Sequence, residues 1–195
     1  MEDVKIITCH GEEILPYLDA AARLRIEVFR EYPYLYDGSE KYEREYLSHY
    51  LQSPGSVFVC ALSSEKVIGI STALPLKDAD EGFQLPFLQH GKPIDEIYYL
   101  GESVLLPAYR GRGMGHAFFD HRESRARELG YRTATFCSVM RAPDHPLRPN
   151  GYRDHENFWS HRHYQRNGLF AELAWKQIDS TGDVSNRLEF WERDL

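Results

Sequence analysis

The chain has 195 residues, of which 42% are hydrophobic, and a formal net charge of −7. This composition predicts a globular protein rather than a disordered one, and the negative charge argues against nucleic acid as the main partner. No apolar run of about 18 residues is present, so we expect no membrane span, and the N-terminus shows no apolar signal segment. Three widely spaced cysteines (Cys9, Cys60 and Cys137) indicate free thiols and a cytoplasmic protein.

The first half of the chain predicts a strand, two helices and a β-hairpin. Apolar residues recur at helical spacing between Ile14 and Phe29, and Ser39 stands where it could cap a second helix. Two β-branched runs separated by four polar residues are typical of a hairpin. We expect a strand over 3–9, helices over 12–31 and 39–52, and paired strands over 56–62 and 67–76.

The second half alternates strands with helices. We expect a long loop over 77–96, a strand over 97–106, a helix after the glycine run that ends at Leu129–Gly130, and a strand over 131–139. An irregular stretch, a short helix over 157–164 and strands over 171–178 and 186–195 then complete the chain. The order β-α-α-β-β-β-α-β-α-β-β predicts an α/β (α+β) fold with a mixed sheet, as a single domain over 1–195.

The stretch YRGRGMGH (109–116) carries the strongest functional signal. It lies where a strand becomes a helix, and the first N–H groups of a helix have no partners within it, so they can bind a phosphate. Six local arginines (Arg110, Arg112, Arg122, Arg125, Arg127 and Arg132) predict a positive island suited to a polyanion. The alternative interpretation is a flexible turn, because glycines also cluster in turns.

The spacing of these glycines identifies the kind of loop. The run lacks the Gly-Lys-Ser/Thr ending of a P-loop and the G-x-G-x-x-G of a dinucleotide fold. Instead, Arg110-x-x-Gly113-x-Gly115 and the surrounding SVLLPAYRGRGMGHAFF resemble the signature of the GNAT family of acetyl-CoA-dependent N-acyltransferases. The predicted element order is similar to the GNAT order along the whole chain, and EYPYLYDGS, GESVL and FW resemble a bacterial subgroup of that family.

The resemblance implies a coenzyme site made largely of backbone. It implies that the amides of the glycine loop bind the pyrophosphate of coenzyme A, and that the preceding strand pairs with the pantetheine arm. An asparagine at the start of the later helix commonly contacts the same arm in this family. The implied cofactor-binding residues are Val104, Leu105, Leu106, Arg110, Gly111, Arg112, Gly113, Met114, Gly115 and Asn157.

The same resemblance implies an acetyl transfer to an amine, which must lose a proton before it attacks the thioester. Glu102 lies beside the expected thioester, so it is a candidate base or substrate anchor; a solvated strand-end glutamate is the alternative, and Glu96 is a weaker rival. Tyr34, Tyr36 and Asp37 lie in the loop that often lines the acceptor site of GNAT proteins. For the tyrosines, ordinary packing against the sheet is the alternative.

Tyr164 is the candidate acid for the departing thiolate, and its role depends on how NFWSHRHYQRNGL is aligned. In one register, Asn157, Ser160, Tyr164, Gly168 and Leu169 match a helical GNAT pattern that faces the tyrosine toward the sulfur. In the other, Phe158-Trp159 matches the FW of the subgroup, Tyr164 starts a strand, and His163 replaces a glycine. The first register fits more positions and is preferred. A packed aromatic residue is the alternative role.

No metal is expected. His161 and His163 are two residues apart and would point apart on a helix, so surface histidines are favoured over a metal site. The predicted function is therefore transfer of an acetyl group from acetyl-CoA to a small-molecule or protein amine in a ternary complex. The competing hypotheses are a non-catalytic acyl-CoA sensing module and an unrelated nucleotide-binding protein. We also consider a homodimer possible.

Overall fold

A seven-stranded sheet forms the centre of the computed structural model, which describes residues 4–195. Its strand order is β1-β2-β3-β4-β5-β7-β6, and every neighbouring pair is antiparallel except β4 and β5. This arrangement confirms the predicted mixed, mostly antiparallel sheet. The strands are β1 (Val4–Cys9), β2 (Val57–Ser63), β3 (Lys66–Pro75), β4 (Ile97–Leu105), β5 (Thr133–Val139), β6 (Gln165–Lys176) and β7 (Asp183–Asp194).

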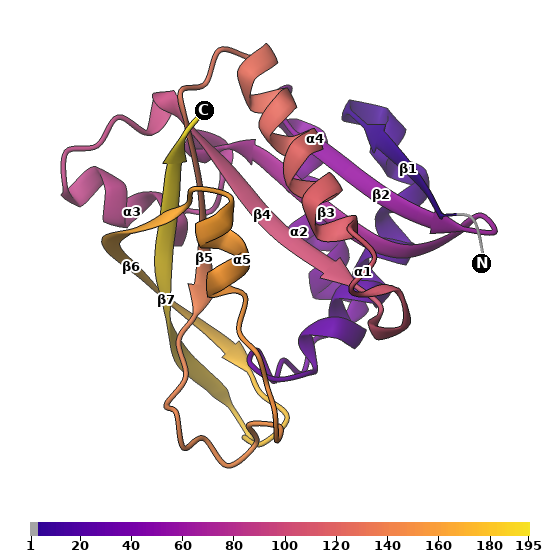
Figure 1. Cartoon of the computed structure of the whole chain (residues 1–195), viewed down its shortest axis with the longest axis vertical. Helices are drawn as coiled ribbons and strands as arrows, with labels where there is room; N and C mark the ends of the chain where they lie inside the picture. Colours follow the sequence, from indigo (N-terminus) through magenta and orange to yellow (C-terminus); the bar gives the residue numbers. More distant parts are fainter. Residues whose placement is uncertain (1–3) are drawn as a thin grey trace.

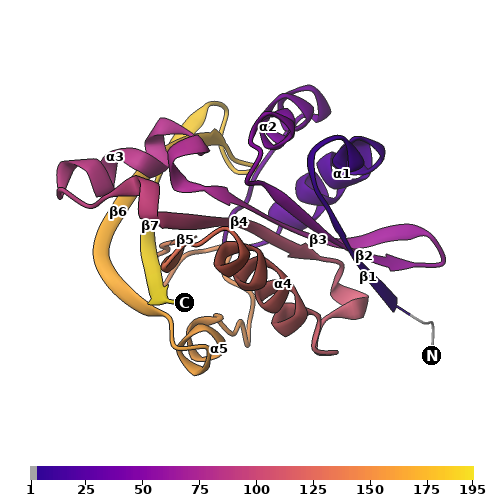
Figure 2. The ribbon, with the colours of Figure 1, turned by 90° about the horizontal axis from the view of Figure 1, so that it is seen from above.

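Helices cover both faces of the sheet (Figures 1 and 2). Helices α1 (Leu18–Phe29) and α2 (Glu40–Gln52) lie on one face, and α4 (Met114–Glu128) and α5 (Glu156–His161) lie on the other. A buried apolar cluster fills each interface; Leu47 and Phe87 belong to the first, and Phe118 and Phe136 to the second. The α/β class predicted from the sequence is therefore confirmed.

Most predicted elements form within a few residues of their expected limits. The first helix is preceded by a 3-10 turn, Gly11–Tyr17, which contains Pro16 and so keeps that residue out of α1. Ser39 caps α2 by accepting a hydrogen bond from the Tyr42 amide, at 3.4 Å. Gly130, in the left-handed conformation, ends α4 as predicted.

Two predicted segments differ from the structure. The expected loop over 77–96 contains a helix, α3 (Glu81–Gln89), which packs beside β6 even though Pro86 lies inside it. The next-to-last strand begins at Gln165 rather than 171, and the helix before it ends at His161. The element order therefore gains one helix, between β3 and β4.

A β-bulge interrupts the pairing of β3 with β4. Ser71 lies opposite Ser103 and Ala73 lies opposite Leu100, so two residues of β4, Gly101 and Glu102, face Thr72 alone. A Cβ atom at Gly101 would come within 2.4 Å of the Tyr50 hydroxyl and 2.6 Å of the Thr72 hydroxyl. Glycine is thus required here by close packing, and the bulge re-aims the strand just where the candidate site begins.

Candidate active site

The parallel strands β4 and β5 separate soon after they pair. They pair over three residues only, from Ile97 opposite Thr133 to Tyr99 opposite Thr135, although β4 continues to Leu105 and β5 to Val139. Beyond Tyr99, the side of β4 that faces β5 is therefore a strand edge without a ladder partner in the described structure. Such an edge can hydrogen-bond an extended ligand that carries amide groups.

The glycine loop lies at the end of this edge and leads directly into α4. Gly111 and Gly113 have φ angles of 75° and 83°, and Gly113 is the N-cap. The first amide that bonds back to this cap is that of Ala117, which donates to the Gly113 carbonyl. Within residues 4–195, the amides from Gly111 to His116 have no hydrogen-bond acceptor, so the loop presents a run of free N–H groups at a helix N-terminus.

The arginines of the loop do not point into this run. The Arg110 amide donates to the Pro107 carbonyl, so the free amides start one residue later than predicted. The Arg110 side chain bonds the Leu105 carbonyl and pairs with Glu31, each at 3.0 Å. The Arg112 side chain donates to the Ala108 carbonyl at 2.9 Å.

The predicted positive island is wrong in part. Arg122 belongs to α4, and its side chain is buried against the sheet. Arg125 and Arg127 lie in the second half of the same helix, where each pairs with a glutamate. The positive character at the loop therefore comes mainly from the helix end and the amides rather than from a cluster of arginines.

Helix α5 lies against the first turn of α4. A Cβ atom at Gly115 would lie 3.3 Å from the Phe158 ring, which also contacts the His116 ring edge-on at 4.9 Å. Asn157 is exposed next to this contact. We keep Asn157 as a proposed contact of the molecule that the free amides of the glycine loop would bind.

Glu102 is buried, which excludes the solvated strand-end alternative. Its carboxylate lies on the α1–α2 face, where Oε2 pairs with Arg25 Nη1 at 2.7 Å and accepts a hydrogen bond from the Tyr46 hydroxyl at 3.5 Å. Arg25 also donates to the buried Glu43 and lies between the rings of Phe29 and Tyr46. Among the described residues, nothing donates to the second oxygen, Glu102 Oε1, so one buried carboxylate oxygen is left for another donor.

Arg25 and Glu43 were missed at the sequence level. Each has a signal there: Arg25 falls on the same helical stripe as the apolar residues Ala21, Ala22 and Phe29, and Glu43 shares a stripe with Leu47 and Tyr50. A charged residue on an apolar stripe is rarely buried unless it is paired. A charged residue on an apolar helical stripe therefore predicts a buried partner of opposite charge in another element.

The two predicted acceptor tyrosines join this cluster, whereas Asp37 does not. Burial, with a contribution from the nearby Cys137, raises the pKa of Tyr34. Its phenol also interacts electrostatically with Arg25 and Glu102. Burial, with a contribution from the nearby Glu43 carboxylate, raises the pKa of Tyr36. Both phenols therefore keep their protons at neutral pH. Asp37 lies outside, paired with Lys176 at 2.5 Å and Arg30 at 3.1 Å.

Glu96, the rival of Glu102, lies at the opposite end of β4. It is exposed in a short 3-10 turn, Ile94–Glu96, immediately before the strand. Five strand residues lie between Glu96 and Glu102, and the six steps along the strand correspond to about 20 Å. Glu96 is therefore too far from the separated strands to act there.

The helical register of residues 157–169 is wrong. Helix α5 ends at His161, and His163 adopts a positive φ of 67°, which is the conformation that a glycine would favour. Tyr164 therefore begins the run into β6, as the second register requires. Its hydroxyl donates to Glu123 Oε1 at 3.1 Å in the core below α4, on the opposite face of the sheet from the Glu102 carboxylate.

This environment does not favour Tyr164 as an acid. Burial, with a contribution from the charge of Glu123, raises the pKa of Tyr164 above its usual value. The assignment of Tyr164 as proton donor depended on the helical register, and the geometry supports the packed aromatic role instead.

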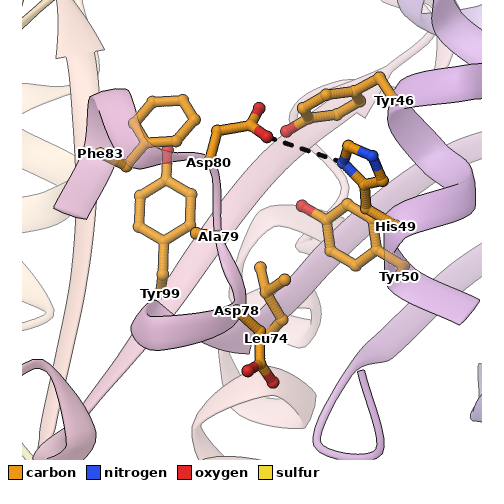
Figure 3. A pocket seen from close by; sticks show the side chains of 9 residues that line it. All are labelled: Tyr46, His49, Tyr50, Leu74, Asp78, Ala79, Asp80, Phe83 and Tyr99. Atoms are coloured by element: carbon orange, nitrogen blue, oxygen red, sulfur yellow. Dashed lines mark ion pairs between the residues drawn. The ribbon is translucent and has the colours of Figure 1, made fainter. Parts of the chain in front are cut away.

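Two cavities border this region. One of about 450 Å³ lies between the end of α1, the glycine loop and the segment after β5, and it is lined by Arg30, Glu31, Tyr32, Leu35, Arg110, Leu147, Pro149, Tyr152 and Ile178. Its volume suits a small-molecule site. The other, between α2 and α3 (Figure 3), has a volume of about 10 Å³, so it holds about one water molecule and no substrate.

Further findings concern metals and membranes. In the described part of the chain, no group of three or more histidine, cysteine or acidic side chains is arranged to hold a metal ion. His163 lies beyond the end of α5, so the His-x-His pair does not share a helix. No helix within residues 4–195 is long and apolar enough to cross a membrane.

Comparison with known proteins agrees with this geometry. The model of the acetyltransferase (GNAT) family matches residues 21–150, and a search of curated proteins found no match. Among solved structures, a ribosomal-protein-alanine N-acetyltransferase from Brucella melitensis is 14% identical with a TM-score of 0.61, covering 97% of this chain and 99% of that one. A GCN5-related N-acetyltransferase from Kribbella flavida is 17% identical with a TM-score of 0.58, covering 98% of each chain.

A third similar structure was determined with a ligand. It is an aminoglycoside N-acetyltransferase in complex with CoA, 15% identical with a TM-score of 0.52, covering 74% of this chain and 80% of that one. Identities this low show a shared fold only. The family model, however, spans more than half of the sequence, and we conclude that the chain belongs to the GNAT family of acetyltransferases.

Proposed function

We propose that this protein transfers an acetyl group from acetyl-CoA directly to an amine. The observation that carries the proposal is the run of free amides from Gly111 to His116, placed at the end of the unpaired edge of β4. A pyrophosphate fits the amides and the helix end, and the amide groups of a pantetheine arm fit the strand edge. The proposed coenzyme contacts are therefore those of Val104 to Leu106, Gly111 to Gly115 and Asn157, with the Arg110 amide left out.

The proposed chemistry centres on Glu102. An arm laid along β4 from the glycine loop brings its thioester toward the bulge, where the Glu102 carboxylate is buried. Oε2 is held by Arg25 and Tyr46, which leaves Oε1 to accept the proton of the attacking amine, directly or through a water molecule. Tyr34 and Tyr36, as neutral phenols beside this cluster, would help to orient the acceptor.

The environment of Cys137 does not favour a mechanism with a covalent acyl-enzyme. Cys137 lies in β5, one of the two strands that separate, and burial raises its pKa to about 12. Its thiol accordingly stays protonated at neutral pH, whereas the thiolate is the nucleophilic form. Direct attack by the amine on the thioester avoids this difficulty.

Replacing Cys137 with serine is expected to leave kcat nearly unchanged. Serine is close to cysteine in size and replaces the thiol with a hydroxyl, which can still partner the Tyr99 hydroxyl that lies 3.4 Å from the Cys137 sulfur. Removal of a true covalent nucleophile would instead lower kcat by several orders of magnitude. Steady-state rates of wild type and Cys137→Ser, measured with the same amine, decide between the two mechanisms.

Replacing Gly113 with aspartate is expected to weaken acetyl-CoA binding by about tenfold or more, which corresponds to about 1.4 kcal/mol. The new side chain would strain a residue at φ 83° and place a negative charge at the amides that face the pyrophosphate. Titration calorimetry measures the change. Gly91→Asp is the matched control, because Gly91 also has a positive φ and open space but lies after α3. Equal affinity in folded Gly113→Asp would contradict the assignment.

We propose a small-molecule or protein amine as the acceptor. The larger cavity would admit a small molecule or the end of a side chain, and the similar structures include enzymes named for an aminoglycoside and for a ribosomal-protein alanine. The proposal is tested by incubating the protein with acetyl-CoA and each of a panel of amines, and by measuring the free thiol of coenzyme A that is released. Acetylated amine with an equal amount of free thiol supports it. Tight acetyl-CoA binding without turnover on any amine would favour the sensing module.

A further inference from the structure

Arg122 lies buried on the α4 face of the sheet, directly behind the bulge of β4. Its Nη1 donates to the carbonyl oxygens of Thr72 and Glu102, both at 3.3 Å, and its Nε donates to the Phe118 carbonyl at 3.1 Å. Thr72 and Glu102 are the residues that face each other across the bulge. A single guanidinium therefore joins the two strands where their regular ladder is interrupted.

Burying the Arg122 guanidinium lowers the stability of the folded state. The side chain of Arg122 is almost wholly buried, and its three hydrogen-bond acceptors are backbone carbonyls rather than carboxylates. Burial lowers the pKa of Arg122 to about 10, so it still carries its charge at neutral pH. A buried charge without a paired counter-charge costs stability that an apolar side chain would not. Packing alone therefore does not explain an arginine at this position.

The other face of the bulge is fixed as well. The Glu102 amide donates to the Thr72 hydroxyl at 3.4 Å, that hydroxyl donates to Tyr50 at 2.9 Å, and the Glu102 carboxylate pairs with Arg25. Arg25 and Arg122 thus hold Glu102 from opposite faces of the sheet, one through its side chain and the other through its main chain. The residues that follow, up to Leu105, form the unpaired edge.

We propose that Arg122 is a positioning residue of the acyl-transfer reaction, which sets the bulge of β4 so that the strand edge receives the pantetheine arm and Glu102 meets the acceptor. The inference rests on the proposed function. It differs from a purely structural role because the arginine acts on the arm and on Glu102, while the phosphate-binding amides of the glycine loop do not depend on it.

The test compares Arg122→Lys and Arg122→Met with two controls. Lysine keeps the charge, but it is shorter than arginine and lacks the second donor atom, Nε, that fixes Arg122 on the Phe118 carbonyl, so it cannot hold both bulge carbonyls in the same geometry. Methionine keeps the apolar stem alone. Arg125→Met removes a guanidinium from the same helix at a site that contacts Pro54 and Glu128. Ala126→Gly destabilises α4, with an expected fall in Tm of about 2–4 °C, without touching the bulge.

Two ligands separate the parts of the coenzyme site: acetyl-CoA and 3′-phospho-ADP, the half of coenzyme A that lacks the pantetheine arm. In Arg122→Lys we expect kcat to fall by about 10²-fold and acetyl-CoA affinity to fall, because small misplacements at a reacting centre have effects of that size. The affinity for 3′-phospho-ADP should stay at the wild-type value, and both controls should keep wild-type kcat.

Each outcome has a clear meaning. Wild-type kcat and acetyl-CoA affinity in folded Arg122→Lys and Arg122→Met would overturn the positioning role and leave the proposed function intact. Equal losses for acetyl-CoA and 3′-phospho-ADP, or a matching loss of kcat in Ala126→Gly, would show general destabilisation and also overturn it. If wild type neither binds nor turns over acetyl-CoA, the proposed function fails first, and this inference with it.

Discussion

Replacing Arg25 with methionine is expected to lower the free energy of unfolding by about 3–5 kcal/mol, the range for breaking a buried ion pair by removing one partner. Arg25 pairs with Glu102 and donates to Glu43, and both carboxylates are buried. Without the guanidinium, two like charges would face each other away from water. Burial alone would lower the pKa of Arg25, but Glu102, Tyr46 and Glu43 outweigh it and raise that pKa.

Urea denaturation of Arg25→Met beside Arg44→Met measures this effect. Arg44 pairs with Asp19 and Glu40 on the surface, so its loss should cost about 1 kcal/mol or less. Similar unfolding curves for the two variants would mean that the buried cluster contributes little to stability. The ion pair with Arg25 would then not explain the fixed position of Glu102.

Replacing Glu102 with glutamine is expected to lower kcat by about 10²-fold while acetyl-CoA affinity stays nearly intact, as for the loss of a general base. Glutamine has almost the same size and can still accept from Arg25 and Tyr46, but it cannot take a proton from the amine. The coenzyme would be bound by backbone amides that this change does not touch.

Glu96→Gln is the matched control for this measurement, because Glu96 is exposed before the same strand and should have wild-type kcat. Rates and calorimetry on both variants across pH 6–9 test the assignment. Full activity of Glu102→Gln over this range would remove Glu102 from the chemistry.

Local sequence signals predict most of the sheet and the glycine loop. The strand before Arg110 and the helix after Gly113 each have the periodicity of their class, and the glycines mark the junction. Helix α3 could not be predicted in this way, because Gly82 and Pro86 within it and Gly91 after it indicate a loop. Tertiary contacts stabilise this helix: Phe87 is fully buried and packs edge-on against Phe190 of β7, with 4.9 Å between the ring centroids.

The site was predicted only in part for a similar reason. Glu102, Tyr34 and Tyr36 were identified, and the structure brings them together around Arg25. Arg25 itself comes from a helix about 80 residues earlier, and no local pattern links the two segments. The helical register of Tyr164 was predicted wrongly, because five residues match the helical pattern although α5 ends at His161. The positive φ of His163, which ends the helical run, is a property of the folded chain.

An amide NMR titration of the isotope-labelled protein with acetyl-CoA tests directly whether the glycine loop and the edge of β4 form one coenzyme site. We expect the largest shifts in two segments, the amides from Gly111 to His116 and those of β4 from Leu100 to Leu105, and we expect both to saturate at the same concentration. Shifts confined to other parts of the chain, or none at millimolar acetyl-CoA, would contradict this expectation.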